Sequence, residues 1–527
     1  MAESACSGSL TPLYRRRRTF AVAGDDTGEE VEQRQRWQRW QRRQPPQQED
    51  DDDDDGTSVL PDGIILHILS FLPTRDVFKT RVLSTRWRAL CDAVPTLAFS
   101  LPGGGAGFSS VAPFCSFVDA VLDLRSTTHV ARFHLDIPCL YPTSKLESKL
   151  GSWLRFAAAC RVQDLRLDIA RLRFFPVLRS LRDCPSLVEL RLRGGRLGLE
   201  LTSGVINWAS LRVLSMAYLR LTDDEMRAVL AGSPALESLE LQYCSGATRI
   251  EARSRRMREL VIDGWEPFSA VSPPLLEVSA PHLQTLRLLG NFPRMELSLT
   301  EDISVAEAEL NFFMSIDRGD RFDYYRWPRH LARGILRKLR SATKFTFGSW
   351  CLQVLSRWEK GDSPLLLPNC KSLILNTRCR SWECHGILNM IECSPQVEKL
   401  VIKMVQPFWK SLEFDIDFQA FTFGTQLCSG PLKWKNKLEC LDQHLRQVDI
   451  VQFDPRDHLS SRLLGLVELI LTEARVLDRM LIDARKVEAD GSDSAMALDP
   501  PKLLEVFQSI LCHQRASENA RVVLCHD

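Results

Sequence analysis

The chain has 527 residues, of which 44% are hydrophobic and 26% charged, an ordinary composition for a soluble folded protein. Its 68 basic and 67 acidic residues give a net charge of +1, which excludes a global field that would attract nucleic acid or an anionic membrane. The sequence has neither an apolar run of membrane-spanning length nor the charge order of a secretory signal. We therefore expect a protein of the cytoplasm or nucleus, with no nucleic-acid or membrane partner, and with its 16 cysteines reduced.

Residues 1–56 contain few aliphatic side chains. A stretch rich in Gln, Arg and Trp at residues 33–48 is followed by an acidic run from Glu49 to Asp55. Such composition cannot bury enough apolar surface to fold, so we predict a disordered charged tail. Nuclear import through the arginine runs, such as Arg15–Arg18, remains an alternative role for it.

Residues 57–100 predict three short helices. The first has an apolar face of Ile64, Ile65, Ile68, Leu69 and Leu72, begins near Pro61 and ends at Pro73. Thr74 is expected to cap the second helix and Ser84 the third. A module of about 40 residues has little interior of its own, so apolar surface left over on it indicates a partner or a neighbouring domain.

These residues resemble a known family, the F-box, especially in its plant versions. The resemblance rests on Leu60-Pro61-Asp62, Ile64-Ile65, Ile68-Leu69, Phe71-Leu72-Pro73, Val82-Leu83-Ser84 and Arg86-Trp87-Arg88. It implies that a Skp-type adaptor lies against Leu60, Pro61, Ile65, Ile68, Leu69, Leu72, Pro73 and Val77, with Trp87 helping to pack the helices. Thr85 and Cys91 depart from the plant pattern, where lysine and tryptophan are common.

Behind the predicted F-box the chain repeats one unit, in which three apolar slots are separated by two residues and then by one. Clear copies begin at residues 187, 211, 236 and 283, and slightly degenerate ones at 162 and 257, so that successive copies are spaced by 25, 24, 25, 21 and 26 residues. These are the spacings of leucine-rich repeats, whose short strands stack into a curved parallel sheet. Further copies begin at 130, 342, 370, 397, 445 and 477. Pro residues before several copies resemble plant F-box repeat proteins.

The predicted fold is therefore α/β, with a three-helix F-box followed by a leucine-rich-repeat solenoid. We assign residues 57–100 to the F-box, 101–125 to a linker and the start of the repeats, with Gly103–Gly105 as a hinge, and 126–410 to the repeats. Residues 411–484 form the last repeats and resemble the FBD-type end of plant F-box proteins. Residues 485–527 form a linker and a terminal amphipathic helix at about residues 502–511.

Residues between the apolar slots point away from the core, onto the concave face where solenoids usually bind partners. The central outward positions are Arg166, Arg191, Ser215, Glu240, Val261 and Arg287. Their mixed charge suits a protein partner better than a phosphate backbone. We predict target binding by Arg166, Arg191, Glu240 and Arg287, with Arg191 first, although solvated strand surface would show the same pattern.

The sequence contains no convincing catalytic constellation. Cys379, Cys384, His385 and Cys393 are only loosely spaced like zinc ligands, without CxxC pairs, so we predict no metal and no cofactor. We expect a non-enzymatic substrate-recruiting subunit of an SCF-type (Skp-cullin-F-box) ubiquitin ligase, which joins a Skp-type adaptor and a cullin-RING ligase to an unknown target. The alternatives are a scaffold or sequestering protein with a divergent F-box, a small-molecule receptor, and an enzyme built around Cys384 and His385.

Overall fold

A computed structural model provides the structure of the chain. It describes residues 60–101, 111–125, 129–137, 144–169, 180–198, 205–266, 275–293, 295–300, 303–314, 326–356, 365–405, 438–453, 460–484 and 500–525. The chain divides into two units, Met1–Pro61 and Asp62–Asp527. The predicted tail at residues 1–56 lies outside the described residues, and so do Gly103–Gly105.

The second unit begins with the helices of the F-box region. These are α2 (Asp62–Leu69), α3 (Thr74–Lys79), the short 3-10 helix η1 (Thr80–Val82) and α4 (Thr85–Ala93). Pro73, not Thr74, is the N-cap of α3. Ser84 caps α4 as predicted, because its hydroxyl oxygen accepts a hydrogen bond from the Trp87 backbone N–H at 3.1 Å.

Fifteen of the described strands form one parallel sheet, in the order β1-β2-β3-β4-β5-β6-β8-β10-β12-β13-β14-β15-β16-β17-β18. Their bounds are β1 (Thr96–Ser100), β2 (Arg132–Ile137), β3 (Asp164–Ile169), β4 (Glu189–Gly198), β5 (Val213–Arg220), β6 (Ser238–Ser245), β8 (Glu259–Glu266), β10 (Thr285–Phe292), β12 (Glu307–Met314), β13 (Lys344–Phe347), β14 (Ser372–Thr377), β15 (Lys399–Met404), β16 (Gln447–Val451), β17 (Arg479–Asp483) and β18 (Arg521–Cys525). The predicted fold class is confirmed.

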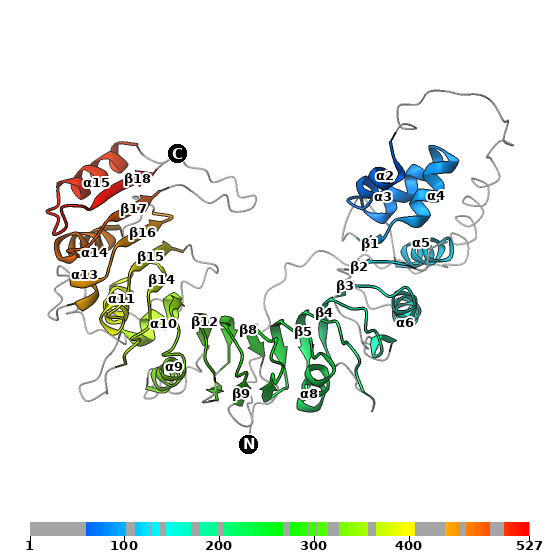
Figure 1. The fold of residues 1–527 in the computed structure, drawn as a ribbon, viewed down its shortest axis with the longest axis horizontal. Helices are drawn as coiled ribbons and strands as arrows, with labels where there is room; N and C mark the ends of the chain where they lie inside the picture. Colours follow the sequence, from blue (N-terminus) through cyan, green and yellow to red (C-terminus); the bar gives the residue numbers. More distant parts are fainter. Residues whose placement is uncertain are drawn as a thin grey trace, which may run out of the picture. The chain divides into compact units, whose positions relative to one another are not determined.

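Helices follow many of these strands. They are α5 (Val111–Asp123), α6 (Ser144–Ala159), α8 (Asp223–Gly232), α9 (Arg326–Lys338), α10 (Ser349–Leu355), α11 (Ser381–Cys393), α13 (Glu439–Gln443), α14 (Ser460–Glu473) and α15 (Pro500–Cys512). Between β6 and β12 the described residues form short strands instead of helices. These strands, β7 (Arg249–Glu251), β9 (Leu275–Ser279) and β11 (Glu296–Leu299), make a second parallel sheet. Figure 1 shows the long sheet curving, with the helices on its outer side. We call the other side of the sheet its open face.

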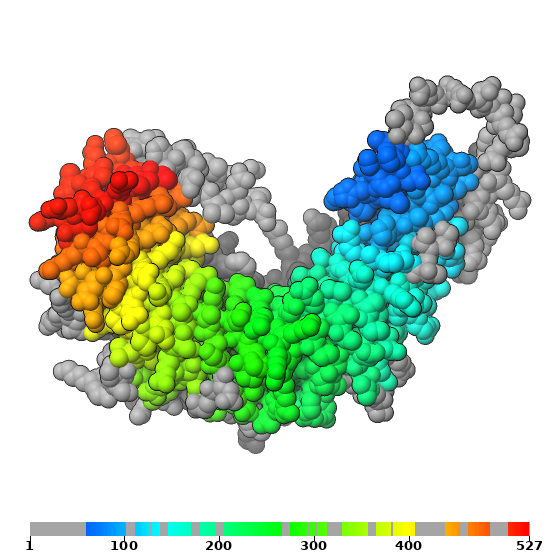
Figure 2. All heavy atoms as spheres, in the orientation of Figure 1, coloured from blue at the N-terminus to red at the C-terminus, as the bar shows by residue number. Residues whose placement is uncertain are grey.

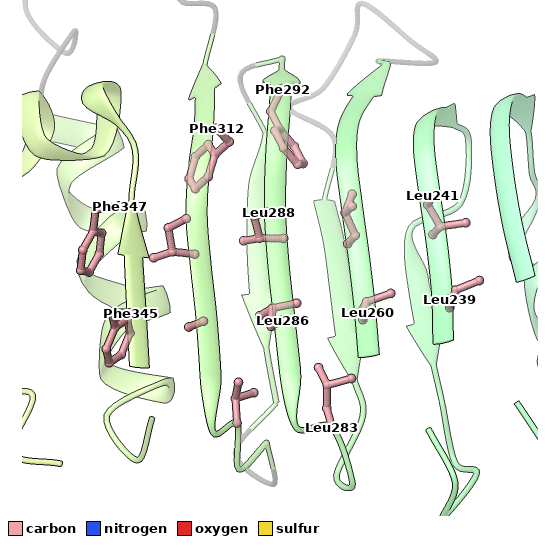
Figure 3. Close-up of a cluster of buried hydrophobic side chains, with 14 of the residues drawn as sticks. Leu239, Leu241, Leu260, Leu283, Leu286, Leu288, Phe292, Phe312, Phe345 and Phe347 are labelled. Atoms are coloured by element: carbon pink, nitrogen blue, oxygen red, sulfur yellow. The ribbon is translucent and has the colours of Figure 1, made fainter. Parts of the chain in front are cut away.

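The slot residues of the repeats form the core. Leu239, Leu260 and Leu286 occupy the same register position on neighbouring strands, and none of them is exposed to solvent. Figure 3 shows this row and, beyond Phe312 of the neighbouring strand β12, the aromatic side chains Phe345 and Phe347 of β13. In the space-filling view the colours follow the sequence without interleaving, so each described repeat packs mainly on its neighbours (Figure 2).

The sheet starts earlier and ends later than the sequence indicates. β1 lies inside the range assigned to the F-box, yet it pairs with β2 from Thr96↔Arg132 to Ser100↔Asp136. The range assigned to a linker and the start of the repeats contains α5, and Gly103–Gly105 fall between β1 and α5 rather than between the F-box and the sheet. At the other end, α15 is not terminal, because β18 follows it and pairs with β17.

Candidate protein-interaction surfaces

The F-box region exposes an unusual amount of apolar side chain. Six of the 15 exposed large apolar side chains in the described residues lie within the 20 residues from 64 to 83. We call them the F-box surface: Ile64, Ile68, Phe71, Leu72, Val82 and Leu83. Ile64, Ile68 and Phe71 lie four and three residues apart, which places them on one side of α2 and its final turn. A concentration of this kind on a folded domain marks a contact surface.

The eight residues expected to contact the adaptor, together with Trp87, divide into exposed and buried groups. Pro61, Ile68, Leu72 and Pro73 are exposed, and Leu60 and Trp87 are partly exposed. Ile65, Leu69 and Val77 are at most 2% exposed. They lie in the interior of the helical module, so the structure revises their expected role from contact with a partner to packing of the helices.

Conversely, sequence reasoning assigned no adaptor contact to Ile64, Phe71, Val82 and Leu83. Phe71 is 74% exposed, more than the other five side chains of the F-box surface. The helical spacing that predicts α2 indicates which side of the helix is apolar. It does not indicate which of the apolar residues fit into the small core and which stay on the surface. The signal was present as a doubled run, Ile64-Ile65, followed by Phe71-Leu72.

Polar contacts join the ends of the F-box module. Both Nε and Nη2 of Arg86 donate to Oδ1 of Asp62, at 2.8 and 2.7 Å, so the pair ties the start of α2 to α4.

The thiol of Cys91, a residue that departs from the plant pattern, is fully buried and donates to the Val77 carbonyl at 3.2 Å. Burial raises the pKa of this thiol, so it stays protonated and acts as a small core residue. Thr85, the other departure, is exposed.

The F-box module packs directly on the first repeat. The backbone N–H of Ala98, in β1, donates to the Thr74 hydroxyl oxygen at 2.7 Å. Phe117 of α5 links the two parts, because its ring lies 6.2 Å from that of Phe78 and 6.1 Å from that of Phe99, edge to face in both cases. These contacts make the F-box and the beginning of the sheet one packed body.

The predicted outward positions form one continuous row on the open face. Registers pair Arg166 with Arg191, Ser215 with Glu240, and Val261 with Arg287. Links between these pairs complete the row, which reads His134, Arg166, Arg191, Ser215, Glu240, Val261, Arg287 and Glu309. The predicted residues are thus brought onto one surface.

Charges in this row are neutralised mainly by neighbours on the same face. Arg166 Nη2 lies 3.1 Å from Glu189 Oε1, the oxygen that also accepts from Arg191, and Arg287 Nε donates to Glu309 at 2.7 Å. Hydrogen bonding to Glu189 raises the pKa of Arg191, and hydrogen bonding to Glu309 raises that of Arg287. Both guanidinium groups therefore remain charged and already have a partner.

A stack of rings that the sequence did not reveal lies beside this row. The rings of Tyr218 and Tyr243 are 5.4 Å apart and nearly parallel, at 9°, and the guanidinium of Arg193 lies 5.1 Å from the centre of the Tyr218 ring. Both tyrosines have positive φ, 57° and 47°, at the point of the repeat where the following strands have Gly264 and Gly290. Tyrosine and arginine are frequent interaction anchors, so this stack extends the candidate surface.

The cysteines considered as metal ligands are buried. Cys379, Cys384 and Cys393 are at most 5% exposed, and the Cys384 thiol donates to the Cys379 carbonyl at 3.6 Å. Hydrogen bonding to Cys384, together with burial, raises the pKa of Cys379, and burial raises that of Cys393 to about 12. Within the described ranges no three His, Cys, Asp or Glu side chains are grouped as metal ligands, and no helix there is long and apolar enough to cross a membrane.

Two family models match the chain. The model of the F-box domain matches residues 58–98, and the model described as "FBD-associated F-box protein At5g56370, LRR repeats" matches residues 150–315. The second match falls on the strands whose slots form the core of the long sheet. The chain thus matches an F-box model and, further along, a leucine-rich-repeat model.

Three proteins from Arabidopsis thaliana illustrate what the chain is similar to. "Putative F-box/LRR-repeat protein At3g18150" is 28% identical over 446 residues, which cover 81% of this chain and 86% of the relative. "F-box/LRR-repeat protein At5g02910" is 26% identical, with 81% and 87% covered, and "FBD-associated F-box protein At1g66310" is 26% identical, with 65% and 75% covered. The predicted resemblance to plant F-box repeat proteins of the FBD-associated kind is confirmed.

Proposed function

We propose that the chain is the substrate-recognition subunit of an SCF-type ubiquitin ligase and is not itself catalytic. The observation that carries this proposal is the F-box surface, six exposed apolar side chains concentrated in 20 residues of a folded module. The match of residues 58–98 to the F-box domain supports a Skp-type adaptor as the partner that covers this surface. The place of action would be the cytoplasm or the nucleus.

The packed joint between the F-box and β1 supports a bridging mechanism. The aromatic contacts of Phe117 fix the F-box against the sheet that carries the open face. Two partners bound to one rigid body are held at a limited range of distances, which raises the effective concentration of the target's lysines near the ligase. Proximity would be the whole contribution of this chain to ubiquitin transfer.

The test is co-purification of the full chain with a Skp-type adaptor. The double variant Ile68→Asp with Phe71→Asp places charge on the F-box surface and leaves the buried residues of the module unchanged. We expect it to weaken adaptor binding at least tenfold, because a charged side chain buried in an interface without a partner is strongly unfavourable.

The matched control is Leu366→Asp with Leu504→Asp. These leucines are 54% and 58% exposed and lie outside the F-box module, so the variant should bind the adaptor like the native chain. Failure of the folded native chain to bind any Skp-type adaptor would replace the ligase function with that of a scaffold or sequestering protein.

A further inference from the structure

The open face differs in charge between the half formed by β1–β12 and the half formed by β13–β18. Outward register positions on β13–β18 include five basic side chains, Lys344, Lys399, Lys403, Arg479 and Arg521, and two acidic ones, Asp449 and Asp483. The two acidic residues are each only 8% exposed. Asp449 accepts hydrogen bonds from Gln447 and lies 3.1 Å from Lys399 Nζ. The accessible charge of this half is therefore positive.

Two of the basic side chains lie next to each other without compensation. Arg479 and Arg521 are register partners on β17 and β18, and both are exposed. Neither forms an ion pair with any residue in the described part of the chain. Like charges directly opposite each other on neighbouring strands are unfavourable, so an anionic partner bound there would remove a repulsion as well as add an attraction.

A column of apolar side chains runs beside these arginines. Ile374, Val401, Leu481 and Val523 occupy the central outward position of β14, β15, β17 and β18, and all are at least partly exposed. We call them the apolar column. On β16, between them, the same position is taken by Asp449, which is only 8% exposed. Arg479 and Arg521, two residues earlier on β17 and β18, form the basic column, whereas Lys399 at the same position of β15 is already paired with Asp449. A purely electrostatic partner, such as a phosphate backbone, would gain nothing from the apolar column.

The other half of the face contains no such pair of columns. Its central row has charged residues, and Arg166, Arg191 and Arg287 are each bonded to a carboxylate of the same face. A partner that bound there would have to break existing ion pairs. The unused binding capacity of the open face is therefore concentrated on β14–β18.

We propose that the open face of β14–β18 binds an extended segment of the target in which acidic and apolar side chains alternate. Acidic side chains would pair with the basic column, and the apolar ones would cover the apolar column. The five strands span about 19 Å at ~4.8 Å per step, the length of about six extended residues. This inference rests on the proposed function, since it names the class of target that the ligase subunit would recruit.

The experiment measures binding of the full chain, in complex with its adaptor, to fluorescent seven-residue peptides. The probes have Asp or Glu at alternate positions and Leu, Ile or Phe between them, and the control peptides have Asn or Gln instead of the acids. We expect binding of at least one acidic probe, weakened at least tenfold by Arg479→Glu with Arg521→Glu and reduced by raised salt. Val523→Asp should weaken it as well, because it interrupts the apolar column.

A matched charge reversal tests whether position matters. Arg255→Glu with Arg256→Glu changes the net charge equally in the exposed turn before β8, and we expect it to leave probe binding unchanged. Adaptor binding, measured on the same samples, separates the two proposals. If the native chain binds the adaptor but none of the acidic probes, only the peptide site is overturned.

Three results would overturn the inference. The first is equal binding of acidic and amide probes, or no binding of either. The second is that an RNA oligonucleotide binds to the same arginines while the acidic probes do not. The third is that probes bind only after Glu413, Asp415 and Asp417 are changed to Asn or Gln. Residues 412–418, LEFDIDF, lie outside the described residues but have the proposed alternation, so that result would make the chain's own segment the occupant.

Discussion

At the scale of single residues, the backbone at the end of the repeat strands sets limits on the ring stack. Gly264 has a φ of +74°, and a Cβ atom there would lie 2.7 Å from Cε1 of Tyr243. Tyr218 and Tyr243 adopt the same left-handed region without being glycine, which costs roughly 1 kcal/mol each. The ring stack therefore depends on a glycine beneath it.

Gly264→Ala should accordingly destabilise the protein by roughly 1–3 kcal/mol, from backbone strain and displacement of the Tyr243 ring. Chemical denaturation measures the loss, and near-ultraviolet circular dichroism reports the tyrosines. Gly334→Ala is the control. Gly334 lies within α9 with open space around it, so alanine there should be neutral or stabilising by up to about 1 kcal/mol. Equal effects of both variants would contradict the proposed packing.

The carboxyl group of Asp164 has a shifted pKa that can be tested through the pH dependence of stability. Burial raises the pKa of its carboxyl group, but hydrogen bonds with His134 and Arg166 outweigh burial and hold the pKa below its ordinary value. A depressed pKa stabilises the folded state above the unfolded value of about 3.9, and that stabilisation is lost as the pH falls through the folded pKa.

Asp164→Asn should therefore lower the free energy of unfolding at pH 7, and its difference from the native chain should shrink as the pH falls below about 4. Asp168 provides a comparison of opposite sign, because burial raises its pKa. Its ionisation opposes folding, so Asp168→Asn should gain relative stability as the pH rises through that raised pKa. Urea unfolding at a series of pH values distinguishes the two, and parallel curves would contradict the assignment.

At the scale of elements, the helix α8 shows how local sequence fixes a boundary. Thr222 and Glu225 form a reciprocal capping box, in which the Thr222 oxygen accepts from the Glu225 N–H and Glu225 accepts from the Thr222 N–H. Asp223 in the same turn accepts from the backbone N–H groups of Thr248 and Arg249, which ties the helix to β7. The first turn of α8 thus fixes the position of residues 248 and 249 as well as the start of the helix.

Thr222→Ala should cost about 1 kcal/mol of stability, and hydrogen exchange should accelerate first at the beginning of α8. Ser152→Ala serves as the control, since the Ser152 hydroxyl donates to the Lys149 carbonyl within α6 and caps nothing. The capping assignment fails if exchange in the first turn of α8 is unchanged in a folded Thr222→Ala variant.

The sequence predicted most strands of the long sheet from their apolar slot patterns. All 12 recognised slot patterns correspond to strands of the long sheet. β12 was missed because Ala308 fills the slot where its neighbour β10 has Leu286, and β18 because its slots are Val522 and Leu524 with no leucine ahead of them. β1 was missed because its apolar residues directly follow a helix and continue its hydrophobic run.

The candidate site was predictable only in part, for a different physical reason. Periodicity identifies which residues point outward on a strand, so Arg166, Arg191, Glu240 and Arg287 were placed correctly on one face. It does not identify how outward charges pair between strands, because partners such as Arg287 and Glu309 lie 22 residues apart in the chain. The difference between the two halves of the face follows from that pairing.

At the scale of the whole described unit, the joint at Phe117 decides whether the F-box and the sheet act as one body. Its ring contacts Phe78 on one side and Phe99 on the other, and Phe99 continues to Phe133 at 5.8 Å. Each such ring pair contributes roughly 0.5–1.5 kcal/mol beyond the burial of area. A rigid F-box and a loosely tethered one would present the same surfaces but hold their partners differently.

Phe117→Ala should loosen this joint and cost about 2 kcal/mol or more. We expect hydrogen exchange to increase in α3 and β1 while β14–β17 keep their protection, and ubiquitin transfer by an assembled ligase to fall while adaptor binding is retained. Phe313→Ala is the control, because Phe313 is 36% exposed and lies on β12, away from the F-box. Undiminished transfer by the Phe117 variant would contradict a rigid bridge.

The parallel pairing of successive strands has a consequence for biosynthesis. If the side strands β7, β9 and β11 are set aside, each strand of the long sheet after β1 pairs with the strand that precedes it in the chain. A new strand would therefore find its partner already made as it leaves the ribosome. The F-box helices and β1 would be the first to assemble, and the arginines of β17 and β18 the last. A nascent chain would thus be competent to bind an adaptor before its last strands are made.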